Sequence, residues 1–315
     1  MNRTNIDRGG AARAVFGSTK LWTSDDIIVD LSPTLQDVTA SLYGPVDKVK
    51  TDLVVRIPLR LWGAWENLSV LFPSALVSPV RGTSVFPSSD VALTLYATNG
   101  DTLTFHNAAI TKMANLYLGA DQNMWASDVE FTALLAKDAT PGALSSYFTF
   151  ATGSYTAEAF SKSKFTRVRH SAQWDTATNG LDTFDALNGF RVDWNVGLQP
   201  VPADGLGTID MVVDTFEASC TCQPIGESFA DVLTQLQANR TANGTLTAAL
   251  GCADLIITGG SGLSSVTLKN AYIASTKAAF SPMSPRIGET VWKTLTGLSG
   301  GVQQPMAALT TSNDT

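Results

Sequence analysis

The sequence has little charge and few of the side chains that carry most enzyme chemistry. Only 16% of its 315 residues are Asp, Glu, Lys or Arg, against about 25% in an ordinary soluble domain. An isolated monomer normally keeps a charged surface, so the missing charge favours extensive contact with other subunits. Two histidines and three cysteines form the whole stock of the usual metal and nucleophile residues: His106, His170, Cys220, Cys222 and Cys252.

Long hydrophobic runs are also absent. No segment approaches the ~18 apolar residues of a membrane-spanning helix, and the polar start Met1 to Asn5 lacks the apolar segment of a secretory signal. We therefore expect a protein made and folded in a cytoplasm, with no membrane partner. The net charge of −7 argues against general coating of nucleic acid.

The few reactive residues do not have the spacing of a known site. Cys220 and Cys222 are separated by one residue, which is not the Cys-x-x-Cys of a zinc or redox site, and no histidine lies near them in the sequence. On a strand both thiols would point to one face, so we interpret them as two small buried hydrophobes. His106 lies in an alternating run and is interpreted as a strand-surface side chain. The sequence predicts no catalytic, cofactor-binding or metal-binding residue, and no enzyme.

Two other patterns are weak signals of chemistry. The glycine-rich segment Thr258 to Gly262 lacks a following Lys-Ser/Thr and precedes an alternating run, so a hairpin turn explains it better than a phosphate-binding loop. Carboxylates are frequent in any acidic chain, and the sequence alone places no two of them on one sugar or one metal. Those considered are Asp25, Asp26, Asp175, Asp182 and Asp185.

Short alternating segments bounded by turn residues dominate the chain, and Thr, Val, Ile and aromatic residues at period two are typical of a half-buried sheet. The 37 threonines suit the solvent-facing side of such a sheet. We predict strands at Asp26 to Leu31, Asp52 to Leu61, Val91 to Tyr96, Thr102 to Ile110, Phe165 to His170, Phe190 to Trp194, Thr208 to Cys222, Asp254 to Thr258 and Ser265 to Ile273.

One segment has a clear helical pattern. Apolar residues at i, i+3, i+4 and i+7 predict an amphipathic helix over Glu227 to Ala238, with Ser228 as its N-cap and Asn239 as its end. A shorter helix is predicted at Trp65 to Phe72, where Pro73 limits it. The prediction is a mainly β chain with one helix in each half.

The sequence repeats itself. Leu103 to Ile110 resembles Val266 to Ile273, which aligns Asn107 with Asn270, and we call the difference between these two residue numbers the repeat offset. The same offset aligns Ile57 to Leu59 with Cys220 to Cys222, and a slightly smaller shift aligns Thr51 to Val55 with Ile209 to Val213. We predict two tandem β-sandwich or rolled-sheet units, 1–150 and 151–315, each with a flanking helix. Chance similarity of short strands is the alternative.

A duplicated β unit has a natural use in assembly. Three chains in a closed ring would offer six near-equivalent positions, and neighbours would pair the strand edges that each unit leaves exposed.

The second half resembles the tail tube proteins of long-tailed bacteriophages. The segments that carry this resemblance are Gly207 to Met211, Asp254 to Ile257, Val266 to Ala271, Phe280 to Pro282 and Arg286 to Lys293. The first half carries a looser version around Trp65 to Pro73. The resemblance implies a β-sandwich or rolled sheet whose copies join around a ring, and stacked rings that form the tube for genome passage. It implies a trimeric ring of the duplicated kind, other tail proteins (tape measure, terminator and baseplate) as partners, and location in the virion tail after assembly in the host cytoplasm.

The interval from Thr140 to Leu187 departs from this pattern, because it is too long for a simple linker. It contains Lys162, Lys164, Arg167 and Arg169, which we interpret as a solvated or ring-to-ring strip. Tight phosphate contacts would hinder a moving genome, whereas net negative charge in a channel would lower sticking. Double-stranded DNA is expected to pass without specific binding. The carboxy-terminal residues Gly297 to Thr315 are expected to be ordered by contact with another subunit.

Three other functions fit the sequence less well. A baseplate, tail-terminator or adaptor ring would reuse the same fold within the virion. A carbohydrate-binding β-sandwich could stack sugars on the seven tryptophans, and Asn67, Asn239 and Asn243 are in glycosylation triplets, but there is no secretory signal. An enzyme that uses His106 or His170 is the weakest of the three.

Overall fold

The fold is described from a computed structural model of the chain. The structure describes residues 13–23, 27–31, 33–63, 74–97, 100–113, 115–118, 125–134, 148–153, 170–174, 181–204, 207–225, 232, 252–259, 265–280, 282, 285–295, 298–299, 302–303 and 306–310. These residues are mainly β-strand, and one short helix, α2 (Ser74–Val77), is described over its whole length. The prediction of a mainly β chain is therefore confirmed.

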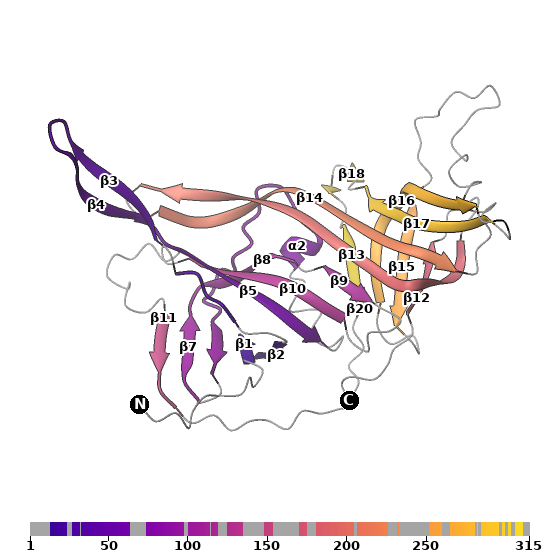
Figure 1. Ribbon diagram of the computed structural model, residues 1–315, viewed down its shortest axis with the longest axis horizontal. Coiled ribbons are helices and arrows are strands. Elements are labelled where there is room, and N and C mark those ends of the chain that lie inside the picture. Colours follow the sequence, from indigo (N-terminus) through magenta and orange to yellow (C-terminus); the bar gives the residue numbers. More distant parts are fainter. Residues whose placement is uncertain are drawn as a thin grey trace.

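Strands of the first half form an eight-stranded antiparallel sheet in the order β11-β7-β6-β1-β2-β5-β10-β8. Figure 1 shows these strands as the indigo to magenta part of the chain. The strands are β1 (Arg13–Phe16), β2 (Thr19–Thr23), β5 (Val54–Gly63), β6 (Leu93–Tyr96), β7 (Thr102–Phe105), β8 (Ala108–Lys112), β10 (Trp125–Leu134) and β11 (Phe148–Ala151).

The β7 and β8 strands are consecutive pieces of one extended segment, separated only by His106 and Asn107. The first piece pairs with β6 and the second with β10. The strands β6, β1, β2, β5 and β10 lie side by side in this order. Both outer members of this row, β6 and β10, therefore pair with the same extended segment.

Strands of the second half form a closed barrel of six strands in the order β12-β15-β16-β17-β14-β13. The barrel closes because β12, the first strand in this order, pairs with β13, the last, as well as with β15. One long strand again serves two neighbours: the first part of β16 pairs with β15 and its last part with β17. The barrel strands are β12 (His170–Trp174), β13 (Leu181–Ala203), β14 (Gly207–Ile225), β15 (Ala253–Gly259), β16 (Ser265–Phe280) and β17 (Pro285–Thr294).

Shorter strands complete the described fold. A separate two-stranded hairpin, β3 (Thr34–Ala40) and β4 (Gly44–Asp52), projects from one end of the molecule (Figure 1). The first-half strand β9 (Leu116–Leu118) pairs with β13, so a strand from the first half belongs to the sheet of the second half. β20 (Ala307–Thr310) pairs with β16, and β18 (Leu298–Ser299) pairs with β19 (Val302–Gln303).

Period-two alternation produces the core. On β5 the side chains of Val55, Ile57, Leu59 and Leu61 are buried, whereas Arg56 and the other alternate residues are exposed. The aromatic rings of the barrel pack together: Phe184 and Trp292 stack with centroids 5.8 Å apart. Trp174 is also fully buried, and its Nε1–H donates to the carbonyl of Ala271 at 2.9 Å. Such burial contributes roughly 25 cal/mol per Å² of apolar surface, which favours this fold over an extended chain.

Most strand predictions are confirmed, with two differences. Asp26 to Leu31 is not a strand in its described part, 27–31, where only Asp30 forms an isolated bridge, to Arg56. The alternation there is real, but Ile28 is largely exposed, so no sheet buries that face. Of Phe165 to His170, only His170 lies among the described residues, and β12 begins there.

The predicted helices and several other sequence features lie outside the described residues. Of Glu227 to Ala238 only Val232 is described, and it is helical and buried; Trp65 to Phe72 is not described. The basic residues from Lys162 to Arg169, Asp25, Asp26 and Asp175 also lie outside this part of the chain, as do Asn67, Asn239 and Asn243.

Candidate assembly surfaces

Two long hairpins extend from the sheets, and their strand pairing is the same. We call Thr34 to Asp52 the first arm and Gly197 to Thr215 the second arm. At each tip an alanine pairs with a glycine, Ala40 with Gly44 and Ala203 with Gly207, and the two pairs are separated by the repeat offset. Both glycines have positive φ, 73° and 78°, which glycine adopts without the strain of a side chain.

The pairing of the two arms also breaks at the same places. Each arm has a register shift just before the tip pairing of Thr39 with Pro45 or of Pro202 with Thr208, and a second shift near its base. The pairs at the base are Thr34 with Asp52 and Gly197 with Thr215, again separated by the repeat offset. β-Bulges fix how a ribbon bends and twists, so the arms share their bends as well as their length.

This register corrects one alignment made from the sequence. The smaller shift aligns Val55 with Val213, but Val213 pairs with Leu198 at the position where Lys50 pairs with Leu35. Similar β-branched residues repeat along one face, so a short slip leaves the sequence match intact. The backbone pairing keeps the repeat offset through this region.

The same offset relates the strands that continue from the arms. Trp22 pairs with Trp62 in the first sheet, and Asp185 pairs with Ile225 in the second, each residue one repeat offset later. Asn107 lies between β7 and β8, and Asn270 lies in β16, so each is in an extended segment that pairs with two different strands. They are the only described residues other than glycine with positive φ, at 48° and 49°.

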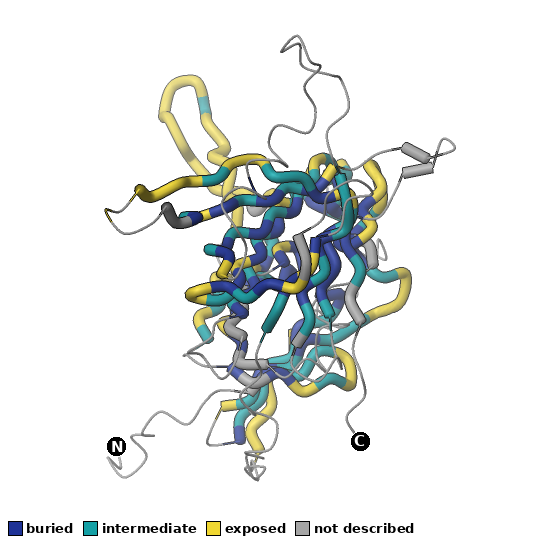
Figure 2. The backbone as a smooth tube through the Cα atoms, turned by 90° about the vertical axis from the view of Figure 1, so that its right-hand side faces the viewer, coloured by how far each residue is buried: buried dark blue, intermediate teal, exposed yellow. Residues whose placement is uncertain are grey.

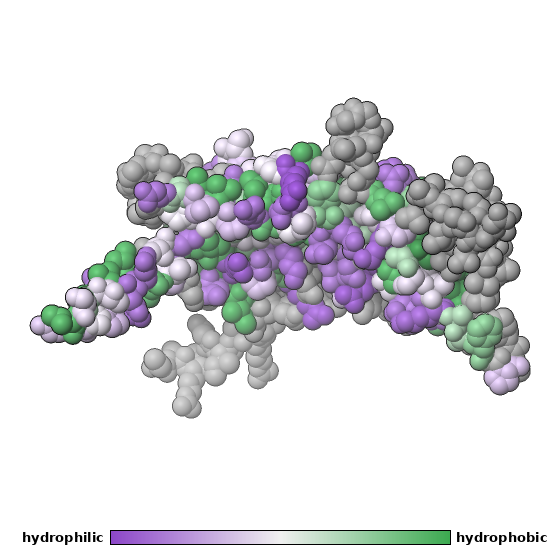
Figure 3. Space-filling view, turned by 90° about the horizontal axis from the view of Figure 1, so that it is seen from above, coloured by the Kyte–Doolittle hydropathy of each residue, from purple (hydrophilic) through white to green (hydrophobic). Residues whose placement is uncertain are grey.

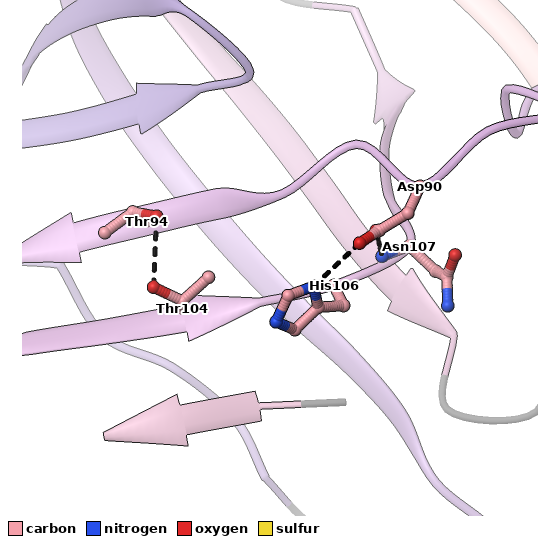
Figure 4. A network of polar contacts seen from close by, with 5 residues as sticks. All are labelled: Asp90, Thr94, Thr104, His106 and Asn107. Carbon is pink, nitrogen blue, oxygen red and sulfur yellow. Dashed lines mark hydrogen bonds and ion pairs between the residues drawn. The ribbon is translucent and has the colours of Figure 1, made fainter. Parts of the chain in front are cut away.

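An aspartate anchors each of these asparagines, as Figure 4 shows for the first. The Asn107 backbone N–H donates to Asp90 Oδ1 at 2.7 Å, and His106 Nδ1 lies 2.7 Å from Asp90 Oδ2. In the second half the Asn270 N–H donates to Asp254 Oδ1 at 3.2 Å, and Lys269 Nζ donates to Asp254 Oδ2 at 2.5 Å. His106 therefore helps to hold a strand corner, and no nucleophile contacts it among the interactions described.

The second arm is seated on the first half of its own chain. The segment Gly82 to Val85 runs along the outer edge of β14: the Gly82 N–H donates to the Val213 carbonyl at 2.7 Å, the Val213 N–H to the Thr83 carbonyl at 3.0 Å, and the Val85 N–H to the Met211 carbonyl at 3.0 Å. These bonds pair an edge that would otherwise be open.

Side chains reinforce this seat at three places. Ser84 Oγ donates to Asp210 Oδ1 at 2.6 Å, and Arg81 pairs with Asp214 at 2.7 Å. At the tip, the backbone N–H and the hydroxyl of Thr208 both donate to the Asp52 carboxylate, at 3.1 and 2.6 Å. The Thr208, Met211 and Val213 side chains are buried as a result.

The first arm has no such cover in the described structure. Every residue from Thr34 to Val49 except Ala40 is exposed, and the arm is a nearly continuous yellow loop in Figure 2. Apolar side chains are among them, with the tip residues Leu42 and Tyr43 85% and 81% exposed and Val46 and Val49 about half exposed. The hydrophobic tip stands at the far left of Figure 3. Within the described residues β4 pairs only with β3, so its outer edge is open.

A second open edge lies on β11. This strand pairs only with β7 in the described structure, and its Phe148 and Phe150 side chains are 42% and 66% exposed. Exposed apolar strands of this kind are sites for pairing with another chain.

A cavity of about 580 Å³ lies where the second arm crosses the first sheet. Its lining includes the carboxylates of Asp30, Asp52 and Glu130 and the cations of Arg56 and Lys112. Over the part of the chain that the structure describes, no three His, Cys, Asp or Glu side chains are grouped so that they could hold a metal ion. The cavity is a space between packed elements of mixed charge.

The two cysteines of β14 have the environment that the sequence predicts. Cys220 and Cys222 are free, buried and on the same face of β14, and burial raises the pKa of the Cys222 thiol well above its usual value, with neighbouring Cys220 adding to the effect. Burial also raises the pKa of Cys252. A high pKa keeps a thiol protonated and unreactive. Desolvation lowers the pKa of His170 to about 4, so this imidazole is neutral near pH 7.

Among the remaining sequence candidates, the side chains that the structure describes form no shared site. Asp182 and Asp185 lie in β13, and the segment from Thr258 connects the antiparallel pair β15 and β16, as a hairpin turn would. Of the seven tryptophans, those whose side chains the structure describes as buried, Trp174, Trp194 and Trp292, are unable to stack on a sugar at the surface.

Comparison with protein-family models finds no match, and no curated protein matches the sequence. Among the described residues there is no helix of the length and apolar character needed to cross a membrane.

Proposed function

We propose that this protein is a structural subunit that assembles with copies of itself into a ring around a channel, and that stacked rings form a phage tail tube. The proposal includes two tandem units in one chain, with boundaries near residue 150, and a flanking helix on each. Its ring is trimeric and imitates sixfold symmetry, its other partners are tail proteins, and its location is the virion tail.

The repeated strand pairing is the observation that carries this proposal. Arms, bulges, continuing strands and asparagine corners recur at one repeat offset. Two similar units in one polypeptide present similar surfaces at a fixed angle, and a closed ring is the assembly in which each such surface finds its counterpart. The low charge and the exposed apolar arm and edge support the same conclusion.

The channel follows from the ring. Double-stranded DNA would pass through it without specific binding, because a chain of net charge −7 has a surplus of carboxylates that repel phosphate. The proposal gives the protein no catalytic role. It rests on shape and self-association rather than on a reactive group.

Electron microscopy of the purified protein tests this function. At high concentration we expect rings or tubes with threefold symmetry and a central hole. A monodisperse monomer over the whole concentration range would contradict the proposal. In virions that carry the protein, a tube subunit should be among the most abundant bands, whereas an adaptor or terminator ring would give a weak one.

A further inference from the structure

We infer that the first arm docks on the second half of another copy of this chain, in the way that the second arm docks on the first half of its own chain. This inference rests on the proposed ring assembly and adds the contact that joins its copies. The observation behind it is that two arms of identical pairing have opposite surroundings.

The two arms carry the same acceptor. Asp210 Oδ1 accepts the backbone N–H of the next residue, Met211, at 2.7 Å, and Asp47 Oδ1 accepts that of Lys48 at the same distance. In the second arm Asp210 also accepts the hydroxyl of Ser84 at 2.6 Å. In the first arm no described side chain occupies that place, and Asp47 is exposed.

The two arms also carry the same kind of outer edge. The β14 edge at Met211 and Val213 is paired by Gly82 to Val85, whereas the matching stretch of β4 around Lys48 is open within the described residues. A row of unpaired amides and carbonyls beside exposed valines is a template for one more strand. The first arm therefore has both the hydrogen-bonding groups and the apolar side chains of a seated arm, but its seat is missing.

The second half of another copy offers a surface like the one on which the second arm docks. The seat of the second arm is the first half of this chain, and the second half repeats its strand pairing at the repeat offset. In a ring the second half of one chain meets the first half of the next. The first arm can then cross the neighbour as the second arm crosses its own first half, with the same bends and the same tip.

The offset predicts which residues meet. The tip of the second arm contacts Asp52 through Thr208. One repeat offset before Thr208 is Pro45, at the tip of the first arm. One repeat offset after Asp52 is Thr215, at the base of the second arm. Because proline has no N–H, the polar bond of the internal seat is not repeated there, and contact at the tip is apolar. Thr215 is exposed in the single chain and is accessible to a neighbour.

Disulfide trapping between two variants, each with one introduced cysteine beside the buried Cys220 and Cys222, tests this contact. Pro45→Cys and Thr215→Cys, each in a Cys252→Ser background, are mixed and oxidised under conditions in which rings form. We expect a disulfide-linked dimer in the mixture and not in either variant alone. The double variant Asp52→Cys/Thr208→Cys is the matched control, and it should form its disulfide within one chain. Ser18→Cys, in the exposed β1–β2 turn, replaces Thr215→Cys in the control for random collisions.

A second measurement does not depend on cross-linking. Val46→Asp and Val49→Asp should each raise the protein concentration needed for half-assembly by about tenfold, the effect of keeping one valine out of an apolar contact. The subunit should remain folded, since both side chains are exposed in it. Ile28→Asp changes an apolar residue outside the arm that is even more exposed, and it should leave assembly unaltered.

The outcomes separate this inference from the function on which it rests. If rings form but the mixed variants give no more dimer than the Ser18 control, and the valine variants assemble normally, the docking is wrong and the ring stands. If the wild-type protein forms no rings and the mixed variants give no cross-link, both fail. A cross-link without visible rings supports the docking and contradicts the closed assembly.

Discussion

Substituting the two tip glycines by alanine is the sharpest test of the difference between the arms within one subunit. Gly44→Ala and Gly207→Ala replace equivalent residues, and both have positive φ. A Cβ added at Gly44 meets nothing within 4 Å. A Cβ added at Gly207 would lie 2.6 Å from Asp52 Oδ1 and 2.8 Å from the Thr51 carbonyl oxygen.

The expected loss of stability is about two to three times larger for Gly207→Ala than for Gly44→Ala. Gly44→Ala should cost only the left-handed conformation, about 1–2 kcal/mol. Gly207→Ala carries the same cost and, because the backbone oxygen of Thr51 cannot turn aside, also pushes the second arm off Asp52. The two hydrogen bonds from Thr208 to that carboxylate are then lost. Bonds to a charged group contribute about 1.5–3 kcal/mol each, and partial exposure of Asp52 places the total for Gly207→Ala at about 3–5 kcal/mol.

Urea unfolding of the unassembled subunit, followed by circular dichroism, measures both losses. Thr208→Val is a useful third variant, since it removes the hydroxyl bond without adding an atom at Gly207. It should fall between the two glycine variants. Equal losses for Gly44→Ala and Gly207→Ala, within about 0.5 kcal/mol, would refute the seating of the second arm on Asp52, because the cost would then be conformational alone.

Three further predictions concern single residues. The pKa of His170 is lowered from 6.5 to about 4, so the unfolded chain takes up a proton before the native protein does. Native stability should fall as the pH drops from 6.5 to 4, by up to about 1.4 kcal/mol per pH unit from this residue. Urea unfolding over this range should show a shallower fall for His170→Gln, and identical slopes would contradict the assignment. In a thiol titration of the native protein at pH 8, Cys252 should react slowly and Cys220 and Cys222 only after unfolding; rapid reaction of all three would show that β14 is open. Asn270→Gly should be nearly neutral, whereas Asn270→Val should lose at least about 1–2 kcal/mol because a β-branched residue is strained at positive φ; thermal unfolding separates them.

Alternation in the sequence predicted part of the strands, and the internal match predicted the spacing of the repeat; the two strands of the first arm, β3 and β4, were not predicted as a hairpin. Alternation along Asp52 to Leu61 and Thr208 to Cys222 predicts strands because every second side chain must be buried, and those segments form β5 and β14. The match of Asn107 with Asn270 supplied the offset that the backbone pairing follows. Alternation was not sufficient at Asp26 to Leu31, where the described residues form only the isolated bridge from Asp30 to Arg56 and Ile28 stays exposed.

The tertiary structure alone decided the closure of the barrel and the surroundings of the two arms. Strand pairing joins residues far apart in the chain, so a local pattern does not reveal that β12 closes on β13 or that Val213 aligns with Lys50 instead of Val55. The arms are alike in register, and their local sequences do not say which one is covered. That depends on whether a partner surface such as Gly82 to Val85 lies beside the ribbon, and only the folded chain brings the two together.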